Sequence, residues 1–448
     1  MISNYRYLVL CGLVLLVGGG WFSLALGGSE ETEAWSQHVA SARAARELGV
    51  TTTVVEEYRA ALALRSELKI ATELTEYLDE LGGEDEYLEW LDELRTAFPD
   101  EAYSYEKFVA AYVEGDEFGS AYESLESAAR NGVTSATLDE LRRTVSYAYQ
   151  VASPAFVDVR GYVGDHAQVF DGDYWFVLDA TGGRFGGRYD EVSDAGSGVV
   201  AVRDQDGPRF VDEHGDVVLV AKRAPYTAYG RMSTSGIFPA RDQGGRVVYV
   251  DRTFAPLHGG TSYADGTPYA YGIAGVQLDD GTWSVIDEAG ATIASGFTAL
   301  VREADGTIAG AERFFGQRDG AYALYGIDGA RVGDLAFDDA RLFADGAAAV
   351  KVGALWGFVS LDGTWAQEPR WQDARSYSNG AAAVAVDGRW GYVDASGTFV
   401  IDAQFGGASP LSSAGRALVI PSDVTVGASA DGEQKPQWAL LRLKRFER

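Results

Sequence analysis

The sequence predicts a multidomain protein with three parts: a transmembrane helix over residues 1–28, an all-α helical-repeat module over 29–150 and an all-β repeat array over 155–448. Three observations lead to this prediction. Residues 7–28 contain no charged side chain. The next 120 or so residues have helical periodicity, with glycines at a regular interval. The remaining two-thirds of the chain repeats an aromatic motif every 33–39 residues.

The composition narrows the classes of partner. The chain has 448 residues and a formal net charge of −29, from 66 acidic and 37 basic side chains. This balance argues against nucleic acid as a partner, because binding to phosphates needs basic residues. The only cysteine, Cys11, lies in the apolar N-terminal stretch, so the sequence permits no intrachain disulfide and no thiolate zinc site. Lipid attachment at Cys11 is disfavoured by the large side chain of Leu10 before it.

The apolar stretch over residues 7–28 is long enough to cross a bilayer as a helix. Arg6 precedes it and an acidic segment over residues 30–33 follows it, so the positive-inside rule places the bulk of the chain outside the cytoplasm. We therefore expect a single-pass membrane protein that is anchored through its N-terminal helix. The alternative is a secreted protein, released when a signal peptide is cleaved near residues 23–25.

The helical module is predicted from three glycines, Gly49, Gly82 and Gly115, which are separated by 33 residues each. Each is expected to end the first helix of a helix pair, where glycine supplies a positive φ. Pro99 is expected in the turn between two such pairs. The second helices then present small or apolar residues for close packing: Ala60, Ala61, Leu91, Leu94 and Ala121.

This spacing and glycine position resemble the tetratricopeptide family, over about 120 residues and three to four units. The resemblance implies a curved groove that binds a peptide or protein partner. The alternative is that the helices serve only as a spacer.

The β-repeat is clearest in two segments, LWGFVSLDGTW from Leu355 and RWGYVDASGTF from Arg389. Strand alternation in W-G-Y-V-D sends Trp, Tyr and Asp to one face and Gly and Val to the other. The small glycine is expected to let a neighbouring unit pack closely, and the D-x-x-G turns are hairpin signals. The structural repeat positions are Trp175, Trp283, Trp356, Gly357, Trp390, Gly391, Asp394 and Gly397.

This pattern resembles the WG repeat family, also called KWG repeats, clearly over residues 337–420 and less regularly before them. The resemblance implies a β-propeller. Seven motif starts and a partial eighth near Trp438 predict six to eight blades, and residues 438–443 are expected to close the ring near Phe156. The alternative is an open β-solenoid, because the repeat is short for a four-stranded blade.

Catalytic signatures are few in this sequence. It has no HExxH, no G-x-x-x-x-G-K-[ST] and no G-x-S-x-G motif, and its four histidines have no ligand-like spacing. The pairs Asp171/Asp173 and Asp204/Asp206 place oxygen ligands close together, but turn capping explains them better than calcium. Trp365 is the best candidate for a sugar platform, although packing is the usual role of repeated aromatics. We therefore assign no catalytic, cofactor or metal residue.

These observations predict a binding or scaffold protein, which mediates protein–protein or protein–glycan interaction through its two repeat modules. The longest insertions lie between residues 220 and 320, and residues 255–270 are the expected binding location. The alternative is an enzyme that acts on cell-surface polysaccharide, with an acidic pair at the mouth of a propeller channel.

Overall fold

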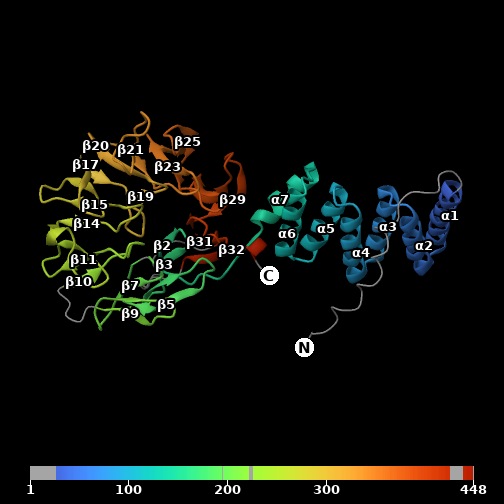
Figure 1. Ribbon diagram of the computed structural model, residues 1–448, viewed down its shortest axis with the longest axis horizontal. Coiled ribbons are helices and arrows are strands. Elements are labelled where there is room, and N and C mark those ends of the chain that lie inside the picture. Colours follow the sequence, from blue (N-terminus) through green and yellow to red (C-terminus); the bar gives the residue numbers. More distant parts are fainter. Residues whose placement is uncertain (1–26, 194, 221–225, 424–436, 447–448) are drawn as a thin grey trace. The chain divides into compact units, whose positions relative to one another are not determined.

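The chain contains two compact units, each described separately below. A computed structural model describes residues 27–193, 195–220, 226–423 and 437–446. One unit extends to Asp116 and includes Glu123–Leu141, and the other contains Glu117–Tyr122 and the chain from Arg142 onward. The first unit is helical and the second is built mainly from strands (Figure 1).

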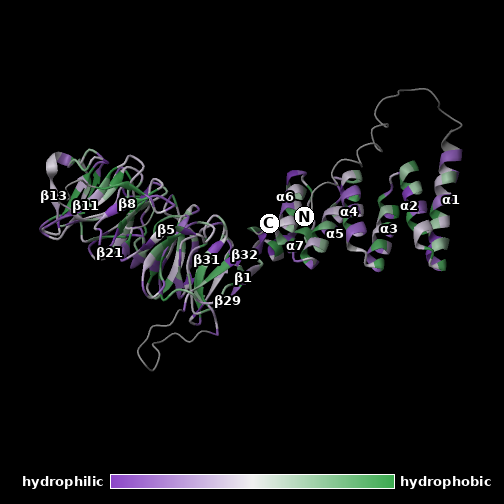
Figure 2. Ribbon diagram, turned by 90° about the horizontal axis from the view of Figure 1, so that it is seen from below, coloured by the Kyte–Doolittle hydropathy of each residue, from purple (hydrophilic) through white to green (hydrophobic). Residues whose placement is uncertain are grey.

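Seven α-helices follow one another in the described part of the N-terminal region. Each lies beside its predecessor in the chain and carries both hydrophilic and hydrophobic residues (Figures 1 and 2). The helices are α1 (Gly27–Leu48), α2 (Thr51–Leu64), α3 (Leu68–Leu81), α4 (Glu84–Ala97), α5 (Ala102–Glu114), α6 (Phe118–Arg130) and α7 (Ala136–Tyr147).

The glycine turns of this region follow the prediction at two of three positions. Gly49 follows α1 with a φ of 72°, and Gly82 ends α3 with a φ of 70°. Gly115 ends α5 with a φ of −75°, so the prediction of a positive φ is wrong there. The next residue, Asp116, takes the left-handed conformation instead, with a φ of 61°. Aspartate tolerates this conformation better than most residues, so the turn still forms.

Buried residues from both helices of each pair form the apolar core of this region. Ion pairs join two of the helices to their counterparts one repeat later: Arg46 of α1 meets Glu80 of α3 at 2.7 Å, and Arg59 of α2 meets Glu93 of α4 at 2.9 Å. Such exposed pairs contribute little free energy, so apolar burial dominates. Of the five residues expected to pack on the second helices, Ala61, Leu91, Leu94 and Ala121 are fully buried, whereas Ala60 is only partly buried. The tetratricopeptide resemblance and its groove stay predictions.

The second unit contains eight four-stranded antiparallel sheets, which we call blades 1 to 8. Blade 1 is formed by β2 (Asp158–Val163), β3 (His166–Phe170), β4 (Trp175–Leu178) and β5 (Arg184–Tyr189), and blade 2 by β6 (Glu191–Val192), β7 (Val200–Arg203), β8 (Arg209–Val211) and β9 (Val217–Leu219). Blade 3 is formed by β10 (Tyr226–Tyr229), β11 (Phe238–Asp242), β12 (Val247–Val250) and β13 (Ser262–Tyr263), and blade 4 by β14 (Asp265–Gly266), β15 (Ile273–Gln277), β16 (Trp283–Asp287) and β17 (Thr292–Phe297).

Blades 5 to 7 continue the series. Blade 5 is formed by β18 (Ala299–Leu300), β19 (Ala309–Gly310), β20 (Arg313–Arg318) and β21 (Ala321–Gly326). Blade 6 is formed by β22 (Asp339–Ala340), β23 (Ala347–Val352), β24 (Leu355–Ser360) and β25 (Trp365–Trp371). Blade 7 is formed by β26 (Asp373–Ala374), β27 (Ala382–Val386), β28 (Arg389–Val393) and β29 (Phe399–Phe405). Two short 3₁₀ helices complete the unit, η1 (His258–Gly260) and η2 (Lys444–Phe446).

Blade 8 closes the ring with strands from both ends of the unit. Its order is β30 (Gly407–Ala408), β31 (Arg416–Ile420), β32 (Ala439–Leu443) and β1 (Tyr149–Val151). Phe156 forms a bridge with Trp438, as the sequence predicted. Leu418 and Leu440 of blade 8 share an apolar cluster with Val169 and Phe176 of blade 1. The array is therefore an eight-bladed β-propeller, and the open solenoid is wrong (Figure 1).

The motif glycines do not act as predicted. A Cβ on Gly357 of β24 would lie 2.6 Å from the Gln367 carbonyl oxygen, and a Cβ on Gly391 of β28 would lie 2.5 Å from that of Ile401. Both carbonyls belong to the outer strand of the same blade. The glycine therefore allows the close approach of the outer strand of its own blade, where the strand pairing has a register shift. It does not allow the close approach of a neighbouring blade, which was the prediction.

The predicted N-terminal transmembrane helix requires correction. Most of residues 1–28 lies outside the residues that the structure describes. Among those that it describes, no helix is long and apolar enough to cross a membrane. The helix α1, which begins at Gly27, is predominantly polar. The fold class is therefore a helical region followed by an eight-bladed propeller, and the prediction of a single-pass membrane location is overturned with the helix.

Candidate functional site: a basic cavity at the propeller centre

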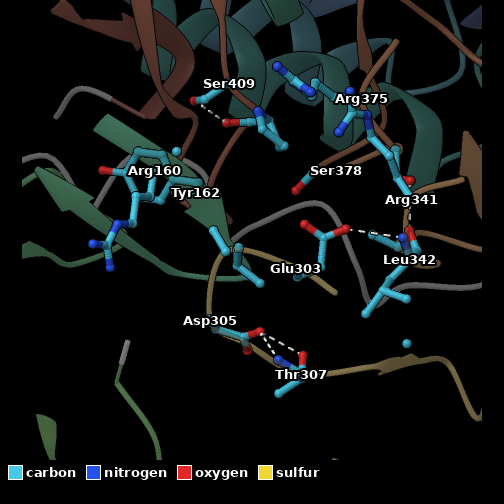
Figure 3. Close-up of a pocket in the computed structure, with 18 of the residues that line it drawn as sticks. Arg160, Tyr162, Glu303, Asp305, Thr307, Arg341, Leu342, Arg375, Ser378 and Ser409 are labelled. Carbon is cyan, nitrogen blue, oxygen red and sulfur yellow. Dashed lines mark hydrogen bonds between the residues drawn. The ribbon is translucent and has the colours of Figure 1, made fainter. Parts of the chain in front are cut away.

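The inner parts of the blades enclose a cavity of about 660 Å³. Blade 1 and blades 3 to 8 contribute its walls, mainly through their first strands and the turns that follow (Figure 3). Pockets of this size, with polar groups from several directions, are the usual location of ligand sites.

Tight turns place side chains at the rim of the cavity. In blade 6 the turn residues Asp345 and Gly346 have φ values of 46° and 80°, and in blade 4 Tyr271 and Gly272 have values of 52° and 79°. Two positive φ values in succession are typical of two-residue hairpins of type I′. Asp345 and Tyr271 both line the cavity, and Tyr271 is 55% exposed.

The cavity is basic although the chain is acidic. Three acidic side chains line it, Glu303, Asp305 and Asp345, against a larger set of basic ones. The five arginines are Arg160, Arg231, Arg302, Arg341 and Arg375. The formal charge of the lining is therefore positive, in a chain with a net charge of −29. A local field of this sign favours an anionic ligand.

Tryptophans of the repeat motif support four of these arginines. A guanidinium over an indole ring is a favourable cation–π arrangement that also fixes the side chain. The guanidinium carbon to ring-centre distances are 4.5 Å for Arg160 and Trp175, 4.2 Å for Arg302 and Trp283, 4.7 Å for Arg341 and Trp356, and 5.1 Å for Arg375 and Trp390. These are the four tryptophans that the sequence singled out as structural positions.

Arg341 and Arg231 illustrate how a channel arginine is normally satisfied. Nε of Arg341 donates to the carbonyl oxygen of Ala374 at 2.8 Å, and its Nη2 donates to Asp373 at 3.2 Å. Arg231 lies 3.6 Å from a carboxylate oxygen of Asp305. Each pair joins different blades, so these arginines connect the ring around the cavity.

Arg375 differs from its repeat counterpart Arg341. Within the described part of the chain, the half-buried guanidinium of Arg375 has no side-chain hydrogen bond and no ion pair within 4 Å, and it lies over the ring of Trp390. Burial lowers the pKa of Arg375 and the charge of Arg341 lowers it further, while the more distant carboxylates of Asp373 and Glu303 oppose the shift without reversing it. A charged group in this environment is costly unless it finds an anion or water.

The two inner carboxylates are engaged by backbone groups. Glu303 accepts a hydrogen bond from the backbone N–H of Leu342 at 3.1 Å. Burial raises the pKa of Glu303, although that hydrogen bond and the charge of Arg341 oppose the shift. Asp305 accepts two hydrogen bonds from Thr307, from its backbone N–H at 2.8 Å and its hydroxyl at 2.6 Å. Both carboxylates therefore brace the wall of the cavity (Figure 3).

Asp394, Gly397 and Trp365, which the sequence also singled out, lie outside the cavity. Asp394 accepts hydrogen bonds from the backbone N–H groups of Ser396 and Thr398, and Gly397 in the same turn has a φ of 77°. Trp365 packs edge-on against Phe337 in the interior. These positions shape blades and do not converge on a site.

The aspartate pairs proposed as calcium ligands are turn residues. Asp204 forms an ion pair with Arg209 at 2.6 Å, and Asp171 accepts a hydrogen bond from the backbone N–H of Tyr174 at 2.9 Å. Over the described ranges of the chain, no three His, Cys, Asp or Glu side chains gather in a way that would hold a metal ion.

The insertions expected to carry binding belong largely to the blades. Residues 262–263 and 265–266 form β13 and β14, and the ring of His258 packs against Tyr249 of β12 at a tilt of 46°. Of residues 255–270, only Ala270 lines the cavity, whereas the wider stretch over residues 220–320 also contributes Arg231, Tyr271 and most of residues 302–310. The arginines were readable as the repeated D-A-R at residues 339–341 and 373–375, but only the fold shows that they converge.

These features define a class of protein, a helical region followed by an eight-bladed β-propeller with a basic central cavity. Within it, residues 356–390 and 390–420 match the family described as WG containing repeat, so the last blades of the ring contain WG repeats, as the sequence predicted.

Among solved structures, the chain is similar to the computationally designed Ika8 protein, with 14% identity, a TM-score of 0.41 and coverage of 66% of this chain and 99% of that one. It is also similar to BamB from Moraxella catarrhalis, with 13% identity, a TM-score of 0.41 and coverage of 66% and 96%. No curated protein matches the chain significantly. At these scores the likenesses carry no functional argument, and the propeller assignment rests on the strand topology.

Proposed function

We propose that this chain is a binding protein and not an enzyme, and that its propeller captures a protein partner at the mouth of the central cavity. The observation that carries the proposal is the basic cavity with the exposed ring of Tyr271 at its rim. Aromatic and arginine side chains are the residues that most often dominate binding energy at interfaces. The helical module supplies a second recognition surface in this proposal, and a glycan partner is the alternative.

The architecture supports this proposal through rigidity. The ring is closed by β1 and β32, so the cavity walls are held by backbone ladders on every side. Arg341 and Arg231 join different blades around the cavity. A preorganised site loses less entropy when its partner binds, which favours affinity. The positive lining also raises the association rate of an acidic surface.

Site-specific crosslinking tests the proposal. A photo-reactive residue replaces Tyr271, which is 55% exposed at the rim, and in a matched control it replaces Val217, which is 54% exposed on the outer strand β9. We expect a discrete protein adduct with cells or extract of the source organism from position 271 and none from position 217. The same adducts from both positions, or none from position 271, would contradict the proposal.

The enzyme alternative has one observation in its favour. Glu303 faces the cavity and burial raises its pKa, which is the property of a general acid in glycoside hydrolysis. Its nearest acidic neighbour in the chain, Asp305, is engaged by Thr307 and Arg231. Release of reducing ends from a polysaccharide, abolished in Glu303→Gln, would favour the enzyme over the binding protein.

A further inference from the structure

We propose that Arg375 is the specific recognition residue of the cavity and that it binds the carboxylate of a ligand. The inference deepens the proposed function, on which it rests, by naming the chemical group that the cavity recognises. It depends on a comparison of two successive repeats that are 34 residues apart, one with a complete ion pair and one without.

The complete repeat shows where the partner of a channel arginine comes from. Arg341 of blade 6 is paired with Asp373, the first residue of β26 in blade 7. One repeat later the arginine is Arg375, and the residue equivalent to Asp373 is Gly407, the first residue of β30. Arg375 therefore retains the position and the tryptophan support of its counterpart but lacks the carboxylate.

The side chain that occupies the vacant position cannot replace the carboxylate. A Cβ on Gly407 would lie 2.8 Å from the Cη2 atom of Trp438, so the indole fills the space that an aspartate side chain would need. An indole offers one N–H donor and no acceptor, and it cannot accept a hydrogen bond from a guanidinium. Trp438 lines the same cavity, so an apolar wall lies where the ion pair would be.

A carboxylate with an apolar body fits this arrangement. A guanidinium matches the two oxygens of a carboxylate and binds them in a bidentate manner. Arg341 nearby adds positive charge, while Glu303, Asp345 and the paired Asp305 disfavour a ligand of high negative charge. The wall formed by Trp438 then favours an aromatic or aliphatic group beside the carboxylate.

Two sources supply this chemistry, a free organic acid and the C-terminal carboxylate of a protein, and matched probes separate them. The first pair is benzoate and benzamide, which differ in charge but hardly in shape. The second is a tripeptide that ends in phenylalanine, with a free or an amidated C-terminus. Inorganic phosphate tests the other common anion. Each is titrated calorimetrically into the full chain and into two variants, Arg375→Gln and the control Arg370→Gln.

The control arginine has the same tryptophan contact but a different location. Arg370 lies 4.4 Å from the ring centre of Trp371 on the outer strand β25 and is not part of the cavity. We expect saturable binding of benzoate, or of the free-ended peptide, and none of its neutral partner. Arg375→Gln should weaken binding by about tenfold or more, because a hydrogen bond to a charged group is lost, and Arg370→Gln should not. Circular dichroism establishes that both variants are folded.

Each result has a defined meaning. Binding of benzoate alone assigns a free acid, and binding of the free-ended peptide assigns a protein terminus. The proposal is overturned if neither carboxylate binds, if only phosphate binds, or if Arg375→Gln binds as tightly as the unaltered chain. A protein adduct at position 271 without carboxylate binding would leave the proposed function standing and remove only this inference.

Discussion

Two pairs of blades have the same four-stranded architecture but carry glycine on different strands. Blades 6 and 7 carry it on the third strand, and blades 1 and 4 on the outer strand. In blades 6 and 7 the third strand carries Gly357 or Gly391 after its tryptophan, and the outer strands contain no glycine. In blade 1 Phe176 occupies that position, and the outer strand β5 contains Gly186 with a φ of 76°. In blade 4 Ser284 occupies it, and β17 contains Gly296 with a φ of 78°.

The register of all four blades shifts at this point in the pairing of third and outer strands. The comparison teaches that the bend of the outer strand is the preserved feature. Glycine permits this bend in two ways. On the third strand it removes a Cβ that would collide with the outer strand, and in the outer strand it allows a positive φ. The WG motif is therefore one of two solutions to the same steric problem.

The largest expected effect tests this reading directly. Gly391→Ala places a Cβ about 2.5 Å from the Ile401 carbonyl oxygen, and the outer strand has to move. We expect a loss of roughly 2–3 kcal/mol in the free energy of unfolding, measured by urea denaturation. The control is Gly388→Ala, where φ is 73° and nothing lies within 4 Å, so only backbone strain of about 1 kcal/mol is expected. Equal losses would show that close approach is not the reason for the motif glycine.

A smaller effect distinguishes blade 7 from blade 6. The buried hydroxyl of Tyr392 donates to the carbonyl oxygen of Ser409 in blade 8 at 2.9 Å, whereas blade 6 has Phe358 at this position. Tyr392→Phe leaves that carbonyl without this donor and should cost about 1–2 kcal/mol in thermal or urea unfolding. Tyr174→Phe, at a 44% exposed position, should cost nothing measurable. A Tyr392 variant as stable as the unaltered chain would contradict this prediction.

The turns of the two regular blades are capped by carboxylates at different positions, Asp394 in blade 7 and Asp362 in blade 6, and hydrogen bonds hold the pKa of both below its ordinary value. Burial raises the pKa of Asp394, but hydrogen bonds from the Ser396 hydroxyl and the Thr398 N–H outweigh it and hold the pKa below its ordinary value. This stabilisation is fully present above about pH 4 and is lost as the pH falls through the lowered pKa. Blade 6 has Ser360 at the position of Asp394.

We expect Asp394→Ala to cost about 1 kcal/mol at pH 7 and progressively less as the pH falls below 4. Urea unfolding of both proteins at pH 7 and pH 3 measures the difference. Ser360→Ala is the control, for which no such loss on acidification is expected. A cost for Asp394→Ala that is the same at both pH values would show that the carboxylate is not the source of the stabilisation.

The smallest effect concerns the cavity. Because burial raises the pKa of Glu303, this carboxyl takes up its proton at a higher pH than an ordinary glutamate. Its protonation removes a negative charge that faces Arg341, Arg375 and Asp305, so benzoate should bind more tightly as the pH falls while benzoate remains ionised. Glu303→Gln should bind roughly two- to fivefold more tightly at neutral pH and lose this dependence. Calorimetry over a pH series tests both expectations. If benzoate binding by Glu303→Gln depends on pH as it does in the unaltered chain, Glu303 is not the group that causes this dependence.

The repeat predicted much of the fold but not its details. The 34-residue spacing of Trp356 and Trp390 predicted stacked β units, and Phe156 predicted the place of closure. Blade number was left open because the eighth motif, near Trp438, is only partial, and its blade takes its outer strand β1 from the other end of the unit. The transmembrane helix was inferred from apolar length alone.

The site was beyond a reading of the sequence for a geometric reason. Trp175, Trp283, Trp356 and Trp390 were singled out as repeat positions, and in the structure they are platforms for arginines that lie in or just after the first strands of the blades. Convergence at the centre depends on ring closure, which brings Arg160 and Arg375 to one cavity from positions 215 residues apart. A repeat alignment shows that Asp373 becomes Gly407, but only the fold gives this difference a consequence.

Closure of the ring by β1 and β32 has a consequence for biosynthesis. Val151 pairs with Leu441, about 290 residues later in the chain. At ~5–20 residues per second, a ribosome needs on the order of 15–60 s to supply the partner of a strand that it has already made. During that interval β1 is an unpaired edge, and blade 1 lacks the neighbour that covers Val169 and Phe176. The exposed edge is only three residues long, which limits pairing with other chains until translation ends.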